Sequence, residues 1–184
     1  MLNTMNRTGK ALALLAVVVV GAGAATGSVL DWTVDADHTE INFVTKHFFT
    51  PVRGSFTDYD VQLSYDAERP ERSTVAVRIG VGSVDTGNER RDEHLRTADW
   101  FNADRWPAIT FRSTSVRRVA ADRLIATGDL TIRDVTKQIE LPITILGVQD
   151  IPGEMQEMLM GAKRVASFRA DLSIDRREFG VGTG

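Results

Sequence analysis

The residues best suited to chemistry lie in a charged segment near the middle of the chain. This segment, SVDTGNERRDEHLRTADWF, spans residues 83–101 and contains Arg91, Asp92 and His94. A histidine two residues from a carboxylate can act as a general base if both side chains reach one pocket. The alternative is structural: Arg91 and Asp92 form ion pairs with a neighbouring strand, and His94 hydrogen-bonds to the backbone.

Other classes of reactive site find little support in the sequence. The three histidines are His38, His47 and His94, and no two of them have the i, i+2 or i, i+4 spacing of paired metal ligands. The chain has no cysteine, which excludes thiol chemistry and disulfides. It also lacks the Gly-x-Ser-x-Gly and Ser-x-x-Lys motifs and a glycine-rich phosphate loop. We therefore expect no metal, no cofactor and no catalytic residue other than the Asp92 and His94 pair considered above.

His47 is a candidate of another kind. It ends a long alternating segment, beside Lys46 and before Thr50 and Pro51. In a barrel this position lies at the mouth, where the imidazole either contacts the head group of a ligand or caps a loop by a hydrogen bond.

The elements that must position these residues are strands. After Trp32, apolar and polar residues alternate as they do in strands with one buried face and one exposed face. We predict about seven antiparallel strands, two short helical excursions at 83–101 and 150–161, and an all-β fold of the extended lipocalin-like barrel type. The predicted strands centre on residues 41–45, 52–65 with a bend at Gly54, 75–81, 109–113, 124–132, 139–145 and 168–174.

The interior of such a barrel is either filled by side chains or hollow, because about eight strands is near the boundary between the two. Ala126, Gly128 and Ala170 are small residues on otherwise bulky faces, which favours a cavity. An apolar ligand is expected there, since buried polar groups without partners are costly. The residues predicted to line the cavity are Phe43, Phe56, Val77, Ile79, Ile109, Phe111, Leu130, Ile132, Leu141, Ile143, Phe168 and Leu172.

The first thirty residues differ from the rest of the chain. Arg7 and Lys10 precede an apolar run that ends in a Gly- and Ala-rich stretch, so residues 1–24 are predicted to be a secretory signal peptide. The alternative is an uncleaved N-terminal anchor. We expect a periplasmic or secreted protein whose barrel domain spans residues 30–184. The formal net charge of −3 does not favour a nucleic-acid partner.

Five stretches of the chain resemble the YceI-like polyisoprenoid-binding proteins. They are DADHTEINFVTKHF, TPVRGSF, SVDTGNERRDEHLRTADWFNADRWPAITFRST, TGDLTIRDVTKQIELPI and ASFRADLSIDRREFG, in that order between residues 35 and 180. The resemblance implies a lipocalin-like barrel, usually periplasmic, that encloses a long isoprenoid chain in an apolar tunnel and has no enzymatic activity. It also implies that Arg91, Asp92 and His94 fasten a short helix, while Leu95 and the aromatic residues that follow press against the barrel wall.

Members of that family continue past the segment equivalent to Glu178, Phe179 and Gly180 into a final strand. The resemblance thus implies a barrel whose last strand is missing here, with two unpaired edges unless something else covers the seam. We expect the protein to bind, sequester or transport a long-chain isoprenoid, such as a quinone precursor or a polyprenyl lipid. The alternatives are a lipid-modifying enzyme that uses Asp92 and His94, and a docking module for a membrane redox partner. A homodimer is also left open.

Overall fold

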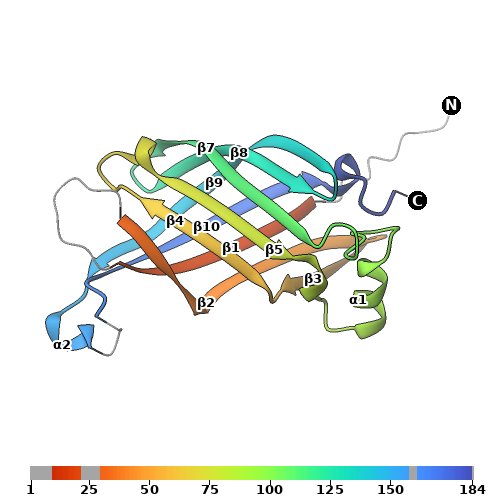
Figure 1. Cartoon of the computed structure of the whole chain (residues 1–184), viewed down its shortest axis with the longest axis horizontal. Helices are drawn as coiled ribbons and strands as arrows, with labels where there is room; N and C mark the ends of the chain where they lie inside the picture. The colour runs from red at the N-terminus through yellow and green to blue at the C-terminus, as the bar shows by residue number, and fades with distance from the viewer. Residues whose placement is uncertain (1–9, 22–29, 158–160, 184) are drawn as a thin grey trace.

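The computed structural model describes residues 10–21, 30–157 and 161–183 of the 184-residue chain. They form an antiparallel sheet that curls around an elongated interior (Figure 1), so the predicted all-β barrel is confirmed. The strands are β1 (Lys10–Gly21), β2 (Leu30–His47), β3 (Thr50–Phe56), β4 (Tyr59–Tyr65), β5 (Thr74–Gly80), β6 (Val84–Asp85), β7 (Ala108–Ala120), β8 (Arg123–Ile132), β9 (Val135–Asp150) and β10 (Arg164–Asp175).

The seam of the barrel is covered by the N-terminal apolar segment. The sheet order is β1-β10-β9-β8-β7-β5-β4-β2-β3-β6, and β1 also pairs with β2. All twelve residues of β1 are in register with β10, and six of them are in register with β2. β1 therefore occupies the place between β10 and β2 that a missing final strand would leave open. Residues 1–9 and 22–24 of the predicted signal peptide lie outside the described residues, and its cleavage stays a prediction.

The prediction of one strand over residues 52–65 is wrong, because the chain breaks between β3 and β4. At the break, the backbone N–H groups of Thr57 and Asp58 donate to the Ser83 hydroxyl, at 3.1 and 2.9 Å. Gly54 does not make a bend. It leaves space for Phe43, since a Cβ at position 54 would lie 2.5 Å from the Phe43 ring.

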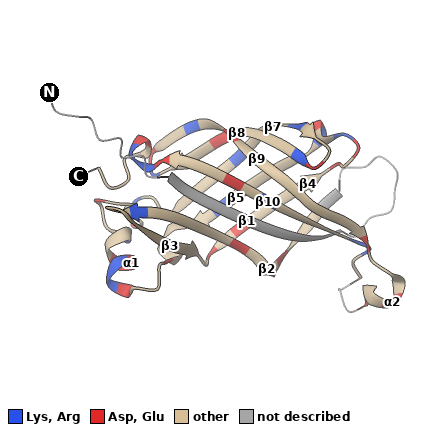
Figure 2. Ribbon diagram, turned by 180° about the vertical axis from the view of Figure 1, so that it is seen from behind, with Lys and Arg blue, Asp and Glu red and all other residues tan. Residues whose placement is uncertain are grey.

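Short helices interrupt the strands at the two ends of the barrel (Figure 1). Both predicted excursions contain an α-helix, and α1 lies at the same end as the C-terminal segment while α2 lies at the opposite end. Acidic and basic residues are interspersed around the barrel (Figure 2). The helices are η1 (Pro70–Arg72), η2 (Val81–Ser83), α1 (Glu89–Arg96), α2 (Gly153–Gln156) and η3 (Arg176–Phe179).

The core differs between the two halves of the barrel. In the half nearer α2, the Tyr65 ring packs edge-on against Phe168, with ring centroids 5.2 Å apart, and lies 6.4 Å from Trp32. At the α1 end, the C-terminal segment folds inward and buries Phe179 and Val181. The C-terminal segment therefore contributes to the packing at this end of the barrel.

Candidate binding cavity

An apolar cavity of about 200 Å³ lies in the half of the barrel nearer α1. The side chains that line it come from β2, β3, β5 and β7 to β10, because residues two apart on a strand share one face. Ten of the twelve predicted lining residues lie here: Phe43, Phe56, Val77, Ile79, Ile109, Phe111, Leu130, Ile132, Leu141 and Leu172.

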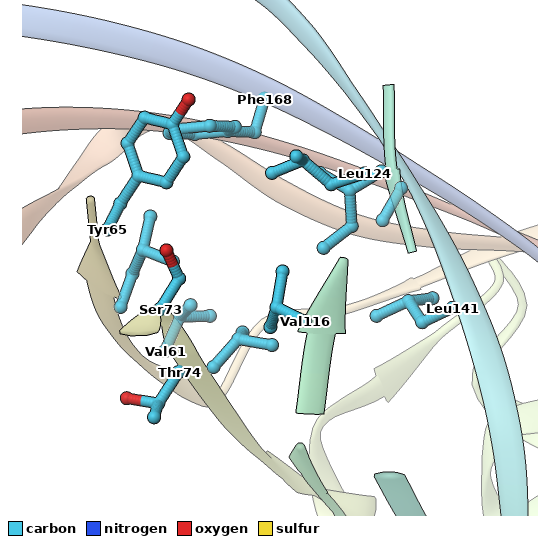
Figure 3. A pocket seen from close by; sticks show the side chains of 12 residues that line it. Val61, Tyr65, Ser73, Thr74, Val116, Leu124, Leu141 and Phe168 are labelled. Atoms are coloured by element: carbon cyan, nitrogen blue, oxygen red, sulfur yellow. The ribbon is translucent and has the colours of Figure 1, made fainter. Parts of the chain in front are cut away.

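A second, smaller apolar cavity of about 40 Å³ lies toward the α2 end (Figure 3). The other two predicted residues, Ile143 and Phe168, line this cavity instead of the large one. Leu141 and Ala170 line both cavities, so the two spaces follow one another along the interior. The prediction treated them as one space, because alternation gives the inward face of a strand but not where side chains meet across the barrel.

The large cavity has lining residues beyond the twelve predicted from the sequence. Ile41, Ile139 and Ile174 continue the same alternating faces, so the pattern itself could have found them. Thr45 and Ala170 lie on the same faces, and Ala170 was expected as a small inward residue. Leu95, Trp100 and Phe101, which the resemblance places against the barrel wall, line the cavity too. No periodicity marks Asn42, Arg176 or Val181. The lining residues outside the predicted set of twelve are Ile41, Asn42, Thr45, Leu95, Trp100, Phe101, Ile139, Ala170, Ile174, Arg176 and Val181.

The helix α1 is held by hydrogen bonds that converge on Thr86. The buried Asp92 carboxylate accepts from the Thr86 backbone N–H at 3.0 Å and from its hydroxyl at 2.5 Å. Arg91 donates to the Thr86 hydroxyl at 2.7 Å and to its carbonyl oxygen at 2.8 Å. Asn88 caps the helix by accepting from the Arg91 backbone N–H. The predicted ion pairs of Arg91 and Asp92 are thus replaced by hydrogen bonds to one threonine.

The structure does not bring His94 and Asp92 together. The two side chains are two residues apart on α1 and therefore diverge. His94 is exposed and packs edge-on against Trp100, with ring centroids 5.8 Å apart. In the described part of the chain its ring makes no hydrogen bond, so the predicted bond to the backbone is also not formed. The general-base arrangement is not assembled in this structure.

His47 lies at the tip of the hairpin between β2 and β3. Its ring is exposed and packs edge-on against Phe48 at 4.7 Å between centroids. It is not among the described residues that line the two interior cavities. The predicted loop-capping hydrogen bond of its ring is likewise not found among the described residues.

Arg176 brings a positive charge to an otherwise apolar cavity. Its guanidinium lies 4.6 Å from the centre of the Trp100 ring, and its Nη1 donates to the carbonyl oxygens of Val181 and Gly182. Burial lowers the pKa of Arg176 below its usual value. Asp175 is engaged by Arg177 instead, and that hydrogen bond lowers the pKa of Asp175 to about 2. Among the described residues that line the cavity, Arg176 is the charged one, and it makes no ion pair within the described chain.

Comparison with known proteins places the fold in a family. The sequence matches the YceI-like domain over residues 32–184. The chain belongs to the YceI-like family. Protein YceI of Shigella flexneri and that of Escherichia coli O157:H7 are each 36% identical to it over 171 residues, which cover 91% of this chain and 84% of each relative.

Two crystal structures resemble this YceI-like chain. A Campylobacter jejuni YceI protein has 32% sequence identity and a TM-score of 0.65, and the match covers 82% of this chain and 84% of that one. BcnA of Burkholderia cenocepacia has 22% identity and a TM-score of 0.61, with 76% of this chain and 99% of that one covered. At that identity the likeness to BcnA shows the fold alone.

In this YceI-like barrel, positions 170 and 128 hold small residues for different structural reasons. Ala170 borders both cavities, as a small residue on a hollow face should. Gly128 is small because β7 approaches closely at a bulge between Ser113 and Ser115, where a Cβ on Gly128 would lie 2.3 Å from the Arg112 carbonyl oxygen. The absence of a side chain at Gly128 is therefore explained by the approach of β7 and is not evidence for a hollow interior.

The described residues of the YceI-like chain contain neither a metal-binding cluster nor a membrane-spanning helix. No three or more His, Asp or Glu side chains are grouped there in a way that could hold a metal ion. No helix in the same residues is long and apolar enough to cross a membrane.

Proposed function

We propose that this YceI-like protein binds the hydrocarbon chain of an isoprenoid lipid inside its barrel and carries or stores it without chemical change. The observation that supports this most is the large cavity, whose lining is almost entirely apolar. Burial of each CH₂-sized group contributes about 0.8 kcal/mol, so an unbranched or methyl-branched chain can bind tightly there without polar contacts. The resemblance of the sequence to polyisoprenoid-binding proteins agrees with this choice. The predicted leader supports an exported location for the activity.

The volume of the interior limits the length of the hydrocarbon chain that the protein can hold. Ligand sites usually enclose about 300 to 1,000 Å³, whereas the large cavity has a volume of about 200 Å³ and the small one of about 40 Å³. We propose that a long chain fills the large cavity first and then extends past Leu141 and Ala170 into the small one. The side chains at that boundary must move for the two spaces to join.

Affinity should therefore rise with the number of isoprene units. Geraniol, farnesol and geranylgeraniol differ by one unit each, and we expect affinity to increase by more than about tenfold per unit while apolar space remains. Titration monitored by calorimetry or tryptophan fluorescence measures this series. A Leu141→Trp variant should bind geraniol as the unaltered protein does, but should bind geranylgeraniol no more tightly than farnesol. Equal affinity for all three alcohols would contradict the proposed function.

Arg176 gives the bound lipid a direction. We propose that it contacts an anionic head group, because a guanidinium without an ion pair beside an apolar space is stabilised by a negative partner. The head group would then lie at the α1 end, against Trp100, and the tail would point toward α2. A prenyl phosphate fits this arrangement better than the alcohol with the same tail.

Arg176→Gln should weaken binding of farnesyl phosphate about tenfold to a hundredfold, because a charge-assisted hydrogen bond is lost. Binding of farnesol should change little, and this separates the head-group contact from damage to the fold. Arg177→Gln is the matched control, since Arg177 is exposed and pairs with Asp175. If the affinities for farnesyl phosphate and farnesol fell equally, the role of Arg176 would be limited to its hydrogen bonds with Val181 and Gly182. Failure of both ligands to bind the unaltered protein would reject the proposed function itself.

A further inference from the structure

The turn between β2 and β3 exposes two adjacent phenylalanines. Phe48 is 72% exposed and Phe49 is 87% exposed, more than any other large apolar side chain in the described part of the chain. His47 and Thr50 are paired across the hairpin, so Phe48 and Phe49 form its two-residue loop. Neither belongs to the core or lines an interior cavity.

The backbone at this turn is strained. Phe48 has a φ of +54°, in the left-handed region where glycine and asparagine are favoured and bulky residues are outliers. A phenylalanine there costs backbone energy, and most of its ring stays exposed apart from the edge-on contact with His47. Stability of the fold therefore does not account for it, and strain of this kind points to a function for the residue.

The strands behind the turn carry a positive charge. Lys46 and Arg53 are exposed, and no acidic residue occurs in residues 41–57. Phe43 and Thr45 line the cavity, so the alternation of β2 and its register with β3 put Lys46 and Arg53 on the outer face. In the described chain neither of the two makes an ion pair, and both charges are available to a partner.

We propose that this hairpin tip, residues 46–53, docks the protein on a lipid bilayer that contains anionic lipids. Phe48 and Phe49 insert below the head groups, where aromatic side chains bind well, and Lys46 and Arg53 contact the lipid phosphates. A protein partner fits less well, because a specific protein interface buries about 1,200 Å² or more and this tip offers two adjacent side chains.

The hairpin tip lies close to one end of the large cavity. Thr45 lines the large cavity and precedes Phe48 by three residues, about 10 Å along an extended strand. Docking at the tip therefore brings the bilayer near the α1 end of the cavity. Insertion of the tip does not depend on the occupant of the cavity, and the tip would insert in the same way if the barrel held another molecule or none.

A single fluorescent label tests the insertion directly, because the chain has no native cysteine. Phe49→Cys in the full chain is labelled with a polarity-sensitive dye and mixed with vesicles of equal parts phosphatidylcholine and phosphatidylglycerol. Emission should shift to the blue and increase severalfold. Leu146→Cys is the matched control, since Leu146 is also exposed but lies on β9, away from the tip. An unchanged signal at position 49, or an equal change at both positions, would overturn the proposal.

Vesicle flotation with unlabelled variants tests each part of the tip. Phe48→Ser with Phe49→Ser should lower the fraction bound by about tenfold or more. Lys46→Gln with Arg53→Gln should reduce binding to the level seen with phosphatidylcholine alone. Leu146→Ser with Val148→Ser should change nothing, and every comparison is made in the full chain so that the N-terminal segment contributes equally. If the tip variants alter only self-association in the absence of vesicles, the tip is a protein contact and the proposal fails.

Discussion

A chain without residues 1–24 should unfold about 10 °C or more below the full chain, because the net loss of many strand hydrogen bonds amounts to several kcal/mol. The deletion removes β1, which pairs along its whole length with β10 and over six residues with β2. Those two strands are then left with unpaired edges in the described fold. Unfolding followed by circular dichroism or calorimetry measures the change.

The control for this deletion is a chain that lacks only residues 1–9, which precede β1. That chain should keep the stability of the full protein. The longer deletion should also associate in sedimentation experiments, since exposed strand edges pair with other chains. Equal stability of the two shortened chains would show that β1 does not hold the seam. The result also matters for export, because cleavage of the predicted signal peptide would remove the same strand.

Asp92→Ala should lower the free energy of unfolding by about 1 to 3 kcal/mol and weaken retention of the lipid at the same time. Asp92 is 6% exposed, and its carboxylate accepts two hydrogen bonds from Thr86. Its loss leaves the Thr86 backbone N–H without this acceptor and loosens α1. Leu95 on α1 and Trp100 just beyond it line the large cavity, so the wall moves with the helix.

Two further variants separate this effect from a change in charge. Asp92→Asn keeps an oxygen acceptor and should lose less stability than Asp92→Ala. Glu93→Ala removes a neighbouring, exposed carboxylate from the same helix and should be nearly neutral. The fastening role of Asp92 would be refuted by an Asp92→Ala protein that unfolds like the unaltered chain and retains the lipid equally well.

Much of the barrel follows from alternation in the sequence. β8 is a clear case, since Leu124, Ala126, Leu130 and Ile132 are buried at spacings of two or four, and the adjacent positions are more exposed. The ten strands exceed the seven predicted for three local reasons. The 52–65 segment breaks in two, the two-residue strand β6 is too short for a pattern, and β1 is apolar on both faces and was predicted to be a leader.

The cavity was less predictable than the strands around it. Residues on the inward face could be named, but Ile143 and Phe168 proved to line the smaller space toward α2. The sequence did not mark Arg176 as a cavity residue, because a charged residue at the end of a strand is ordinarily solvated. The turn at Phe48 shows a similar limit. Its exposure and positive φ depend on the register of β2 with β3, which the sequence does not reveal.

The most direct test of the account is the chemical identity of what the protein carries. The full chain is purified without detergent and extracted with organic solvent, and the extract is analysed by mass spectrometry beside a Leu141→Trp sample prepared in the same way. We predict an apolar molecule in near-stoichiometric amount, with fragments spaced by the mass of an isoprene unit, and a shorter or less abundant species from Leu141→Trp. Recovery of no apolar molecule from a folded protein that also fails to bind added prenyl lipids would contradict the account.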